Sequence, residues 1–374
     1  MKVGFSALNQ SSYHVIPHIQ KLLMQGIRES GGSPILVHKV QDTRGLDAFV
    51  LLNSLALDIQ KEIFENVQHY WTYLLDAPFH HAGWIWLGPS SVNYAVVDPS
   101  HLSLLALLNR TGTFFPHGGD THPFRSWPHR EIDILLTGTA PSIDRKSQLM
   151  KGLSLELQTF AERLIQEALA FPERALEELL IKLLEHQGVN MQVSDSMLVL
   201  TVADHIVRST HRLNLLRAFS EFPVVIAGSG WDKVEMSPRH RWIGEVPYPQ
   251  IAELMSQAKV VLCPGCGFTQ GGHDRILTAM GSGAVPLTMS TPYLSKHFLH
   301  GVHLAYFKKE NEAVDLARLI LGGSHWGVVG EAGHAAVATG HSWVCRGKEF
   351  LALLRGEIGD GHREGELPSE ELVA

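Results

Sequence analysis

Residues 259–288 read KVVLCPGCGFTQGGHDRILTAMGSGAVPLT and decide the expected fold. The apolar residues 260–263 predict a strand, a glycine-rich loop follows, and a helix is predicted to begin near Asp274 before the next strand. Such a loop lets the backbone approach a ligand, and the first turn of a helix offers unpaired N–H groups and the positive end of its dipole. The pattern therefore predicts a phosphate-binding unit of a Rossmann-like domain.

The residues at this predicted helix start favour a diphosphate ligand. Gly271 and Gly272 are expected to bring backbone amides to it, and His273 or Arg275 could donate a charge-assisted hydrogen bond. The alternative is a purely structural loop in a domain without a ligand. The run Cys263-Pro264-Gly265-Cys266 has the spacing of a redox pair or half a zinc site, but the sequence holds no second such pair, which favours simple packing.

The rest of the chain predicts two domains of the same α/β type. Its 374 residues exceed one ordinary core, and apolar strands alternate with amphipathic helices, as in a parallel sheet covered by crossover helices. We expect an amino-terminal Rossmann-like domain at 1–128 and a carboxy-terminal one at 129–340. A Leu- and Glu-rich stretch at about 146–187 predicts a helical insertion in the second domain, and the tail 357–374 is predicted to be disordered.

Composition excludes several classes of protein. Hydrophobic residues make up 45% of the chain and charged residues 18%, with no apolar stretch near the roughly 20 residues of a membrane span. A formal charge of -7 argues against general binding of nucleic acid or anionic lipid. Three cysteines cannot form a disulfide scaffold and no secretion signal is visible, so we expect a cytoplasmic protein.

Other candidate phosphate contacts follow predicted strands of the second domain. Gly138 lies in the turn after the predicted strand 132–137, and Gly228 lies in the glycine turn after residues 224–227. Arg208 and Arg212 frame a predicted strand-to-helix turn after residues 198–207. Either arginine could contact a phosphate there.

Several sequence blocks occur in the order found in one enzyme family. They read LDAPFHH, FFPHGGD, IDILLTGTA, HRLNLLRAF with PVVIAGSGW, GGHDRILTAMGSGAVPLT and ATGHSWVCR, and they span roughly residues 2–350. In this order they resemble GT-B glycosyltransferases, particularly the bacterial group related to the spore-maturation protein CgeB. The resemblance implies the GT-B fold, in which two Rossmann-like domains face each other across a cleft and a final helix, here 341–356, crosses back.

The resemblance also implies a function. The second domain would bind a nucleotide-diphosphate sugar, of UDP or GDP type, and the first would receive a glycan, protein or small-molecule acceptor. No further cofactor is implied, and no metal is expected, because no DxD-like acidic pair follows a predicted strand. Helix dipoles and basic groups would neutralise the diphosphate instead.

One departure from the family keeps two alternatives open. Retaining members often carry two glutamates eight residues apart, where this chain has Gln270 and Thr278. Asp274 lies one helical turn before Thr278, and its carboxylate could accept the ribose hydroxyls instead. The missing glutamates also fit a sugar-nucleotide-binding protein without turnover, and the architecture fits a nucleotide-sugar epimerase.

Candidate bases come from the first domain. An acceptor hydroxyl must lose its proton as it attacks the anomeric carbon, and a histidine or carboxylate can take that proton. Asp76, His80 or His117 could do so, with Asp76 and His117 ranked first. The alternative for His117 is a hinge residue bonded to backbone, Asp76 could be a helix cap, and at least one of the adjacent His80 and His81 is expected to be structural.

Overall fold

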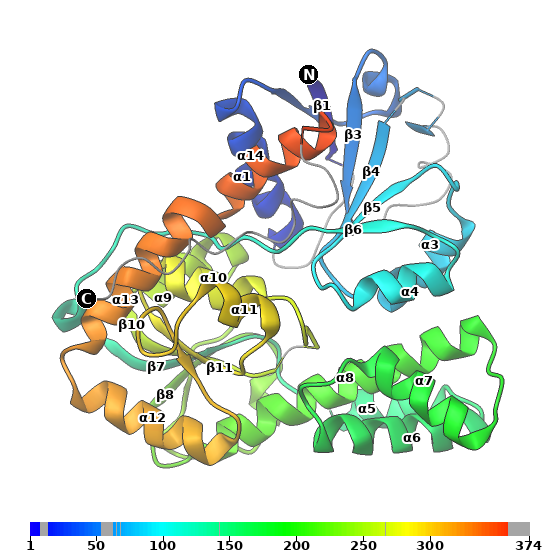
Figure 1. Cartoon of the computed structure of the whole chain (residues 1–374). Coiled ribbons are helices and arrows are strands. Elements are labelled where there is room, and N and C mark those ends of the chain that lie inside the picture. The colour runs from blue at the N-terminus through cyan, green and yellow to red at the C-terminus, as the bar shows by residue number, and fades with distance from the viewer. Residues whose placement is uncertain are drawn as a thin grey trace, which may run out of the picture.

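The computed structural model describes residues 1–7, 14–53, 63–64, 66–67, 69–141, 143–265 and 267–357. These residues form two α/β halves, each built on a six-stranded parallel sheet (Figure 1). The first sheet has the order β2-β1-β3-β4-β5-β6 and the second the order β12-β11-β10-β7-β8-β9. The first-half strands are Lys2–Ser6 (β1), Ser33–Val37 (β2), Ala48–Leu52 (β3), His69–Leu74 (β4), Asn93–Val96 (β5) and Gly112–Phe114 (β6). The second-half strands are Ile132–Thr137 (β7), Val224–Ala227 (β8), Arg241–Trp242 (β9), Ala258–Cys263 (β10), Val285–Thr288 (β11) and Ala305–Tyr306 (β12).

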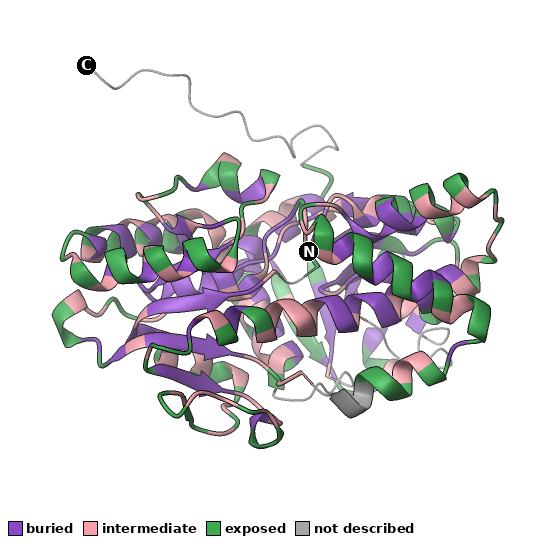
Figure 2. Cartoon of the chain, turned by 90° about the horizontal axis from the view of Figure 1, so that it is seen from below, coloured by how far each residue is buried: buried purple, intermediate pink, exposed green. Residues whose placement is uncertain are grey.

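The apolar strands are buried on both faces, as a parallel sheet requires. Every residue of β3, β8 and β11 is buried. Figure 2 shows the sheets buried beneath helices whose outer faces are exposed. The two-domain α/β prediction from strand composition is therefore confirmed.

The strand order of the second sheet determines where a ligand can bind. From β7 the chain continues to β8 and β9 on one side, and it then crosses to β10, β11 and β12 on the other. Leu135 of β7 accordingly pairs with Val225 on one side and Val261 on the other. Ligands bind outside the carboxyl ends of the strands where the order reverses. In this half that point lies between β7 and β10.

The helical insertion is longer than the predicted 146–187. It consists of α5 (Ile143–Lys151), α6 (Leu155–Ala170), α7 (Leu176–Gln187) and the first part of α8 (Val193–Ala218). Although it is inserted into the second half in sequence, it packs against the first half, below α4 in Figure 1. Met197 and Leu200 of α8 share one buried core with Phe79 and Ile85 of the first half.

The prediction of a strand-to-helix turn at Arg208 and Arg212 is wrong. Residues 198–207 and both arginines lie in the single 26-residue helix α8. Its middle is buried on several faces between α6, α7 and the first half, so it carries an apolar run similar to that of a buried strand. A short run of this kind does not distinguish the two structures.

The expected crossover helix is present as α14 (Trp343–Leu354), which lies alongside α1 (Val15–Glu29) of the first half (Figure 1). Two glycines permit this contact. A Cβ on Gly26 would lie 1.9 Å from the carbonyl oxygen of Val344, and one on Gly347 would lie 2.2 Å from that of Leu23. The predicted disordered tail falls, beyond Glu357, outside the described residues, as does Cys266 of the Cys-Pro-Gly-Cys run.

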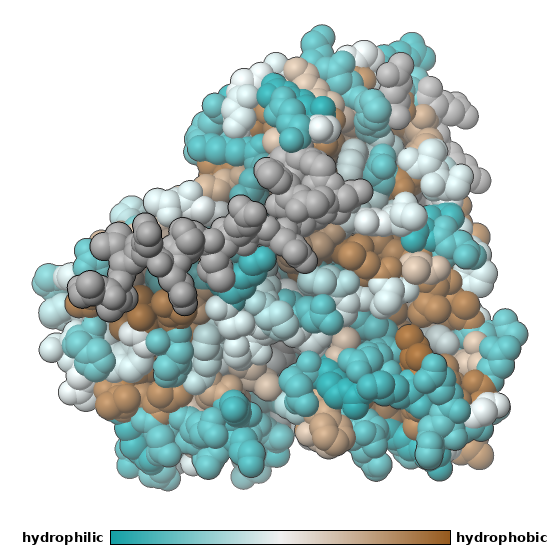
Figure 3. Space-filling view, in the orientation of Figure 1, coloured by the Kyte–Doolittle hydropathy of each residue, from teal (hydrophilic) through white to brown (hydrophobic). Residues whose placement is uncertain are grey.

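Shorter helices complete the two halves. No helix among the described ranges is long and apolar enough to cross a membrane. Figure 3 shows apolar surface over α3 and α4, where Trp84, Trp86, Leu87 and Leu107 are exposed. The remaining helices are α3 (Ala82–Leu87), α4 (His101–Leu107), α9 (Ile251–Ser256), α10 (Asp274–Gly281), α11 (Pro292–His297), α12 (Glu310–Gly322) and α13 (Trp326–Ala336), with a π-helical turn at Val337–His341 and 3-10 turns at Val40–Thr43, Pro78–His81 (η3), Trp127–His129, Trp231–Lys233 (η5) and Tyr248–Gln250 (η6).

Candidate active site

A cavity of about 750 Å³ lies between the two halves, at the carboxyl ends of both sheets. The first half contributes α1 and the ends of β3 and β4. The second half contributes the turns after β7 and β8, one side of α8 and the start of α10. His80, Gly271 and Gly272 are the predicted site residues that do not line it. The predicted residues that do are Asp76, His117, Gly138, Arg208, Arg212, Gly228, His273, Asp274, Arg275 and Thr278.

Positive charge dominates the part of the cavity that belongs to the second half. The described lining includes the cationic side chains Lys146, Arg208, Arg212, Arg217 and Arg275, against the carboxylates Asp76 and Asp274. Arginine forms strong, directional hydrogen bonds with phosphate oxygens, and the walls of a cavity strengthen its field. The arrangement suits a ligand that carries more than one negative charge. Among the described residues, no group of three or more His, Cys, Asp or Glu side chains is placed to hold a metal ion.

The turn after β7 is the backbone part of this basic region. Gly138 adopts a φ of +128°, which a residue with a side chain rarely adopts. A Cβ at this position would lie 3.3 Å from a guanidinium nitrogen of Arg275 and 3.5 Å from the guanidinium carbon of Arg212. Arg212 also donates a hydrogen bond to the carbonyl oxygen of Thr139. The glycine therefore lets two arginines approach the turn closely.

The glycine-rich loop before α10 does not present the unpaired amides that we expected. The amides of Gln270 and Gly271 donate to Oδ2 of Asp98 at 3.0 and 2.7 Å, and Asp98 is fully buried. A Cβ on Gly271 would lie 2.4 Å from the carbonyl oxygen of Val97. A residue of the first half thus already occupies the position assigned to the diphosphate, and the small size of Gly271 serves contact between the halves.

The start of α10 is also capped from within the protein. Nδ1 of His273 accepts a hydrogen bond from the amide of Arg275 at 3.1 Å. This half-buried histidine acts as the helix cap. The side chain of Arg275, rather than the loop amides, is left as the cationic contribution of this helix to the cavity.

Asp274 and Thr278 lie on one face of α10, as the sequence predicts, and both line the cavity. The hydroxyl of Tyr248 donates to Oδ2 of Asp274 at 2.6 Å. Burial opposes ionisation of Asp274, but its contacts with His273 and Tyr248 outweigh burial and hold its pKa well below the ordinary value. The hydroxyl oxygen of Thr278 accepts a hydrogen bond from the amide of Asp120 at 3.0 Å. Asp274 is therefore an ionised acceptor at the cavity wall.

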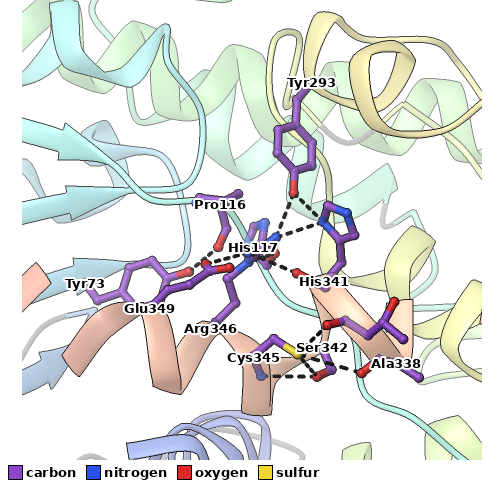
Figure 4. Close-up of polar contacts among 12 residues, drawn as sticks. Tyr73, Pro116, His117, Tyr293, Ala338, His341, Ser342, Cys345, Arg346 and Glu349 are labelled. Atoms are coloured by element: carbon purple, nitrogen blue, oxygen red, sulfur yellow. Dashed lines mark hydrogen bonds and ion pairs between the residues drawn. The ribbon is translucent and has the colours of Figure 1, made fainter. Parts of the chain in front are cut away.

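His117 joins the two halves and has no ring nitrogen available as a base. Nδ1 lies 2.9 Å from the carbonyl oxygen of Gly272, and Nε2 lies 3.1 Å from that of Leu75. The backbone of His117 is fixed as well, because Nε of the buried Arg346 on α14 donates to its carbonyl oxygen at 3.0 Å (Figure 4). The geometry matches the hinge alternative for His117 and not the base.

Among the predicted bases, Asp76 is the one that geometry leaves available. Nε2 of His80 lies 2.8 Å from Oδ2 of Asp204 on α8, and His80 does not line the cavity. Asp76 follows β4 and lines the cavity, and its Oδ2 accepts a hydrogen bond from Asn53 at 3.1 Å. This bond orients the carboxylate at the end of the cavity formed by the first half.

Several solved structures share this architecture. A phage T4 β-glucosyltransferase mutant in complex with UDP-glucose is 11% identical, with a TM-score of 0.55 over 95% of this chain and 99% of its own. Sucrose-phosphate synthase of Thermosynechococcus elongatus is 9% identical, with a TM-score of 0.57 over 96% and 99%. Anabaena HepE with UDP and glucose is 9% identical, with a TM-score of 0.54 over 95% and 100%. These likenesses establish the GT-B fold.

Sequence comparison finds one family similarity, in the second half of the chain. Residues 208–352, which include most of the basic cavity wall, match the family model described as glycosyl transferase-like. The chain therefore has the GT-B fold, and this stretch of it is similar to glycosyl transferases. A search of curated protein sequences finds no significant match.

Several contacts in the cavity or beside it were missed from the sequence. The hydrogen bonds of Asp98, Asn53 and Tyr248 are to residues distant in the sequence. No sequence motif marks Lys146 or Arg217 as residues of the cavity wall. The signal available for Asp98 was a carboxylate directly after an apolar strand, a position at which side chains meet the cleft.

His18 of α1 and Asp120 of the connection between the sheets form another pair that was not expected. Nε2 of His18 lies 2.6 Å from Oδ2 of Asp120. Neither residue lines the cavity, so the pair joins elements beside it.

Proposed function

We propose that this protein is a glycosyltransferase, of the CgeB-related group that its sequence blocks indicate, and that it transfers a sugar from a UDP-type nucleotide sugar to an acceptor hydroxyl. One observation carries the proposal. At the strand-order reversal of the second sheet, Arg212 and Arg275 approach a glycine turn in a cavity of about 750 Å³, which Arg208 also lines. The UDP-glucose bound by the T4 enzyme and the UDP and glucose bound by HepE support this choice of donor.

The donor diphosphate would lie against the turn Gly138–Ala140 and the guanidinium groups of Arg212 and Arg275. Asp274 would accept hydrogen bonds from ribose hydroxyls, since ionised carboxylates accept and do not donate. As the bond between the anomeric carbon and the phosphate oxygen breaks, negative charge grows on the leaving UDP. The arginines stabilise that charge, because preorganised cations act most strongly where charge develops in the transition state.

The acceptor would enter from the first half and face Asp76. Its hydroxyl oxygen forms the new bond to the anomeric carbon, while its proton passes to a carboxylate oxygen of Asp76. We propose that the cationic side chains supply the countercharge without a metal ion. Transfer activity is then expected to survive EDTA. A cytoplasmic location remains an expectation that rests on the cysteine content.

The test begins with binding. Titration calorimetry with UDP and with GDP should give a dissociation constant for at least one of them. Incubation of the corresponding nucleotide sugar with an acceptor panel should then release the nucleoside diphosphate only when an acceptor is present. Binding without acceptor-dependent release from any acceptor would favour the non-catalytic alternative. A changed sugar on an intact nucleotide would identify an epimerase.

A further inference from the structure

The loop after β8 holds the turn after β7 through three hydrogen bonds. This loop, residues 227–231, reads AGSGW. The amide of Gly138 donates to the carbonyl oxygen of Ala227 at 2.9 Å, and the amide of Ala140 donates to that of Ser229 at 2.8 Å. The indole Nε1 of Trp231 donates to the carbonyl oxygen of Gly138 at 2.8 Å. Two backbone contacts and one side chain therefore fix this turn.

Trp231 is a rigid anchor for this arrangement. Its side chain is fully buried in the core of the second half, beside Ile226 and Phe219. The backbones of the two loops also touch, since a Cβ on Gly228 would lie 2.1 Å from the carbonyl oxygen of Gly138. A side chain packed in a core has one well-defined position. The position of the Gly138 carbonyl is thus set by the core.

These bonds leave one amide of the turn unused. The amides of Gly138 and Ala140 both donate within the protein, whereas no described residue accepts a hydrogen bond from the amide of Thr139. Thr139 lines the cavity, and Arg212 and Arg275 approach the turn beside it. A free amide next to two guanidinium groups is the arrangement that binds a phosphate oxygen.

We infer that Trp231 is a positioning residue for the donor diphosphate. Its indole N–H fixes the Gly138 carbonyl and thereby sets where the Thr139 amide and the two arginines meet the ligand. Trp231 does not line the cavity, so it acts through the turn rather than by contact. This inference rests on the proposed function and adds a residue that determines donor affinity.

The decisive variant is Trp231→Phe, which keeps most of the ring and removes the N–H. Trp326→Phe is the matched control. Trp326 is buried in the same core, does not line the cavity, and its Nε1 has no hydrogen-bond partner among the described residues. Both variants should lose some thermal stability. Only Trp231→Phe should weaken binding of UDP, by about tenfold, the loss expected for one misplaced hydrogen bond.

Steady-state kinetics separates positioning from general damage. Trp231→Phe should raise the KM for the nucleotide sugar by a similar factor and leave the KM for the acceptor within about twofold, since the acceptor meets the other half of the cavity. Equal UDP affinity in Trp231→Phe and the wild type would overturn the inference. If the wild type bound neither UDP nor GDP, the proposed function itself would fall.

A glycine pair provides the test if Trp231→Phe does not fold. Gly228 and Gly230 both have positive φ, at +146° and +76°. A Cβ on Gly230 meets only the Cβ of Ala140, at 3.5 Å, whereas one on Gly228 would push the carbonyl oxygen of Gly138. Gly228→Ala should therefore weaken UDP binding more than Gly230→Ala. Equal binding by the two variants would contradict the role of the turn.

Discussion

Asp98→Ala should destabilise the protein by about 2–4 kcal/mol. The fully buried carboxylate accepts hydrogen bonds from the amides of Ser100 at 2.9 Å, Gln270 at 3.0 Å and Gly271 at 2.7 Å. Each buried amide that loses its partner costs about 1–3 kcal/mol. Removal of the carboxylate also removes its own desolvation cost, which offsets several kcal/mol of that sum.

Asp98→Asn tests the same hydrogen bonds with a smaller expected loss of stability. The amide oxygen can replace Oδ2 and keep the bonds from Gln270 and Gly271, but the NH₂ group then faces the Ser100 amide, donor against donor. We expect about half the loss caused by Asp98→Ala. Asp47→Ala is the control, because Asp47 also accepts a backbone N–H, that of Lys2 at 2.6 Å, but at an exposed position. It should change stability by less than about 1 kcal/mol.

Urea unfolding of the wild type and the three variants measures these differences in stability. Small-angle scattering reports whether the two halves separate. Two of the three bonds of Asp98 join the first half to the second. Asp98→Ala should therefore increase the radius of gyration as well as lower the unfolding midpoint. An unfolding midpoint for Asp98→Ala equal to that of Asp47→Ala would refute the role assigned to this carboxylate.

Three further predictions concern catalysis, donor binding and pH. Asp76→Asn should lower kcat by about 10²–10⁴-fold and leave UDP affinity within about twofold, and an unchanged kcat would remove Asp76 as the base. Arg275→Ala should weaken UDP binding by at least about tenfold in calorimetry, and an unchanged dissociation constant would exclude its contact with the diphosphate. Burial raises the pKa of Glu177 from 4.5 to about 7, so the folded state retains a proton that the unfolded state releases. Stability should fall by about 3 kcal/mol as pH rises from 4.5 through 7, and this loss should be absent in Glu177→Gln. Urea unfolding at several pH values checks it, and an equal loss in the variant would contradict the role of Glu177.

The sequence was sufficient to predict the overall architecture. Apolar strands such as Ala48–Leu52 are buried wherever they lie in a parallel sheet, so their composition reports the fold directly. The helix start at Asp274 and the glycine turn at Gly138 follow from local rules and were also located correctly. Both depend on neighbours close in the chain.

Contacts over long sequence distances were not predictable in this way. The Gly271 amide is bonded by Asp98, which is 173 residues away, so no local pattern could show that the amide was occupied. The same holds for His117, whose Nδ1 faces the carbonyl oxygen of Gly272, 155 residues away. Helix α8 was misassigned at Arg208 because its burial comes from packing against the first half.

A crystal structure of the protein with UDP would show where the diphosphate binds. We predict that the β-phosphate lies within about 3 Å of the Thr139 amide and of a guanidinium nitrogen of Arg275, with Asp98 still bonded to Gly271. A diphosphate bound instead to the amides of Gln270 and Gly271, with Asp98 displaced, would contradict it.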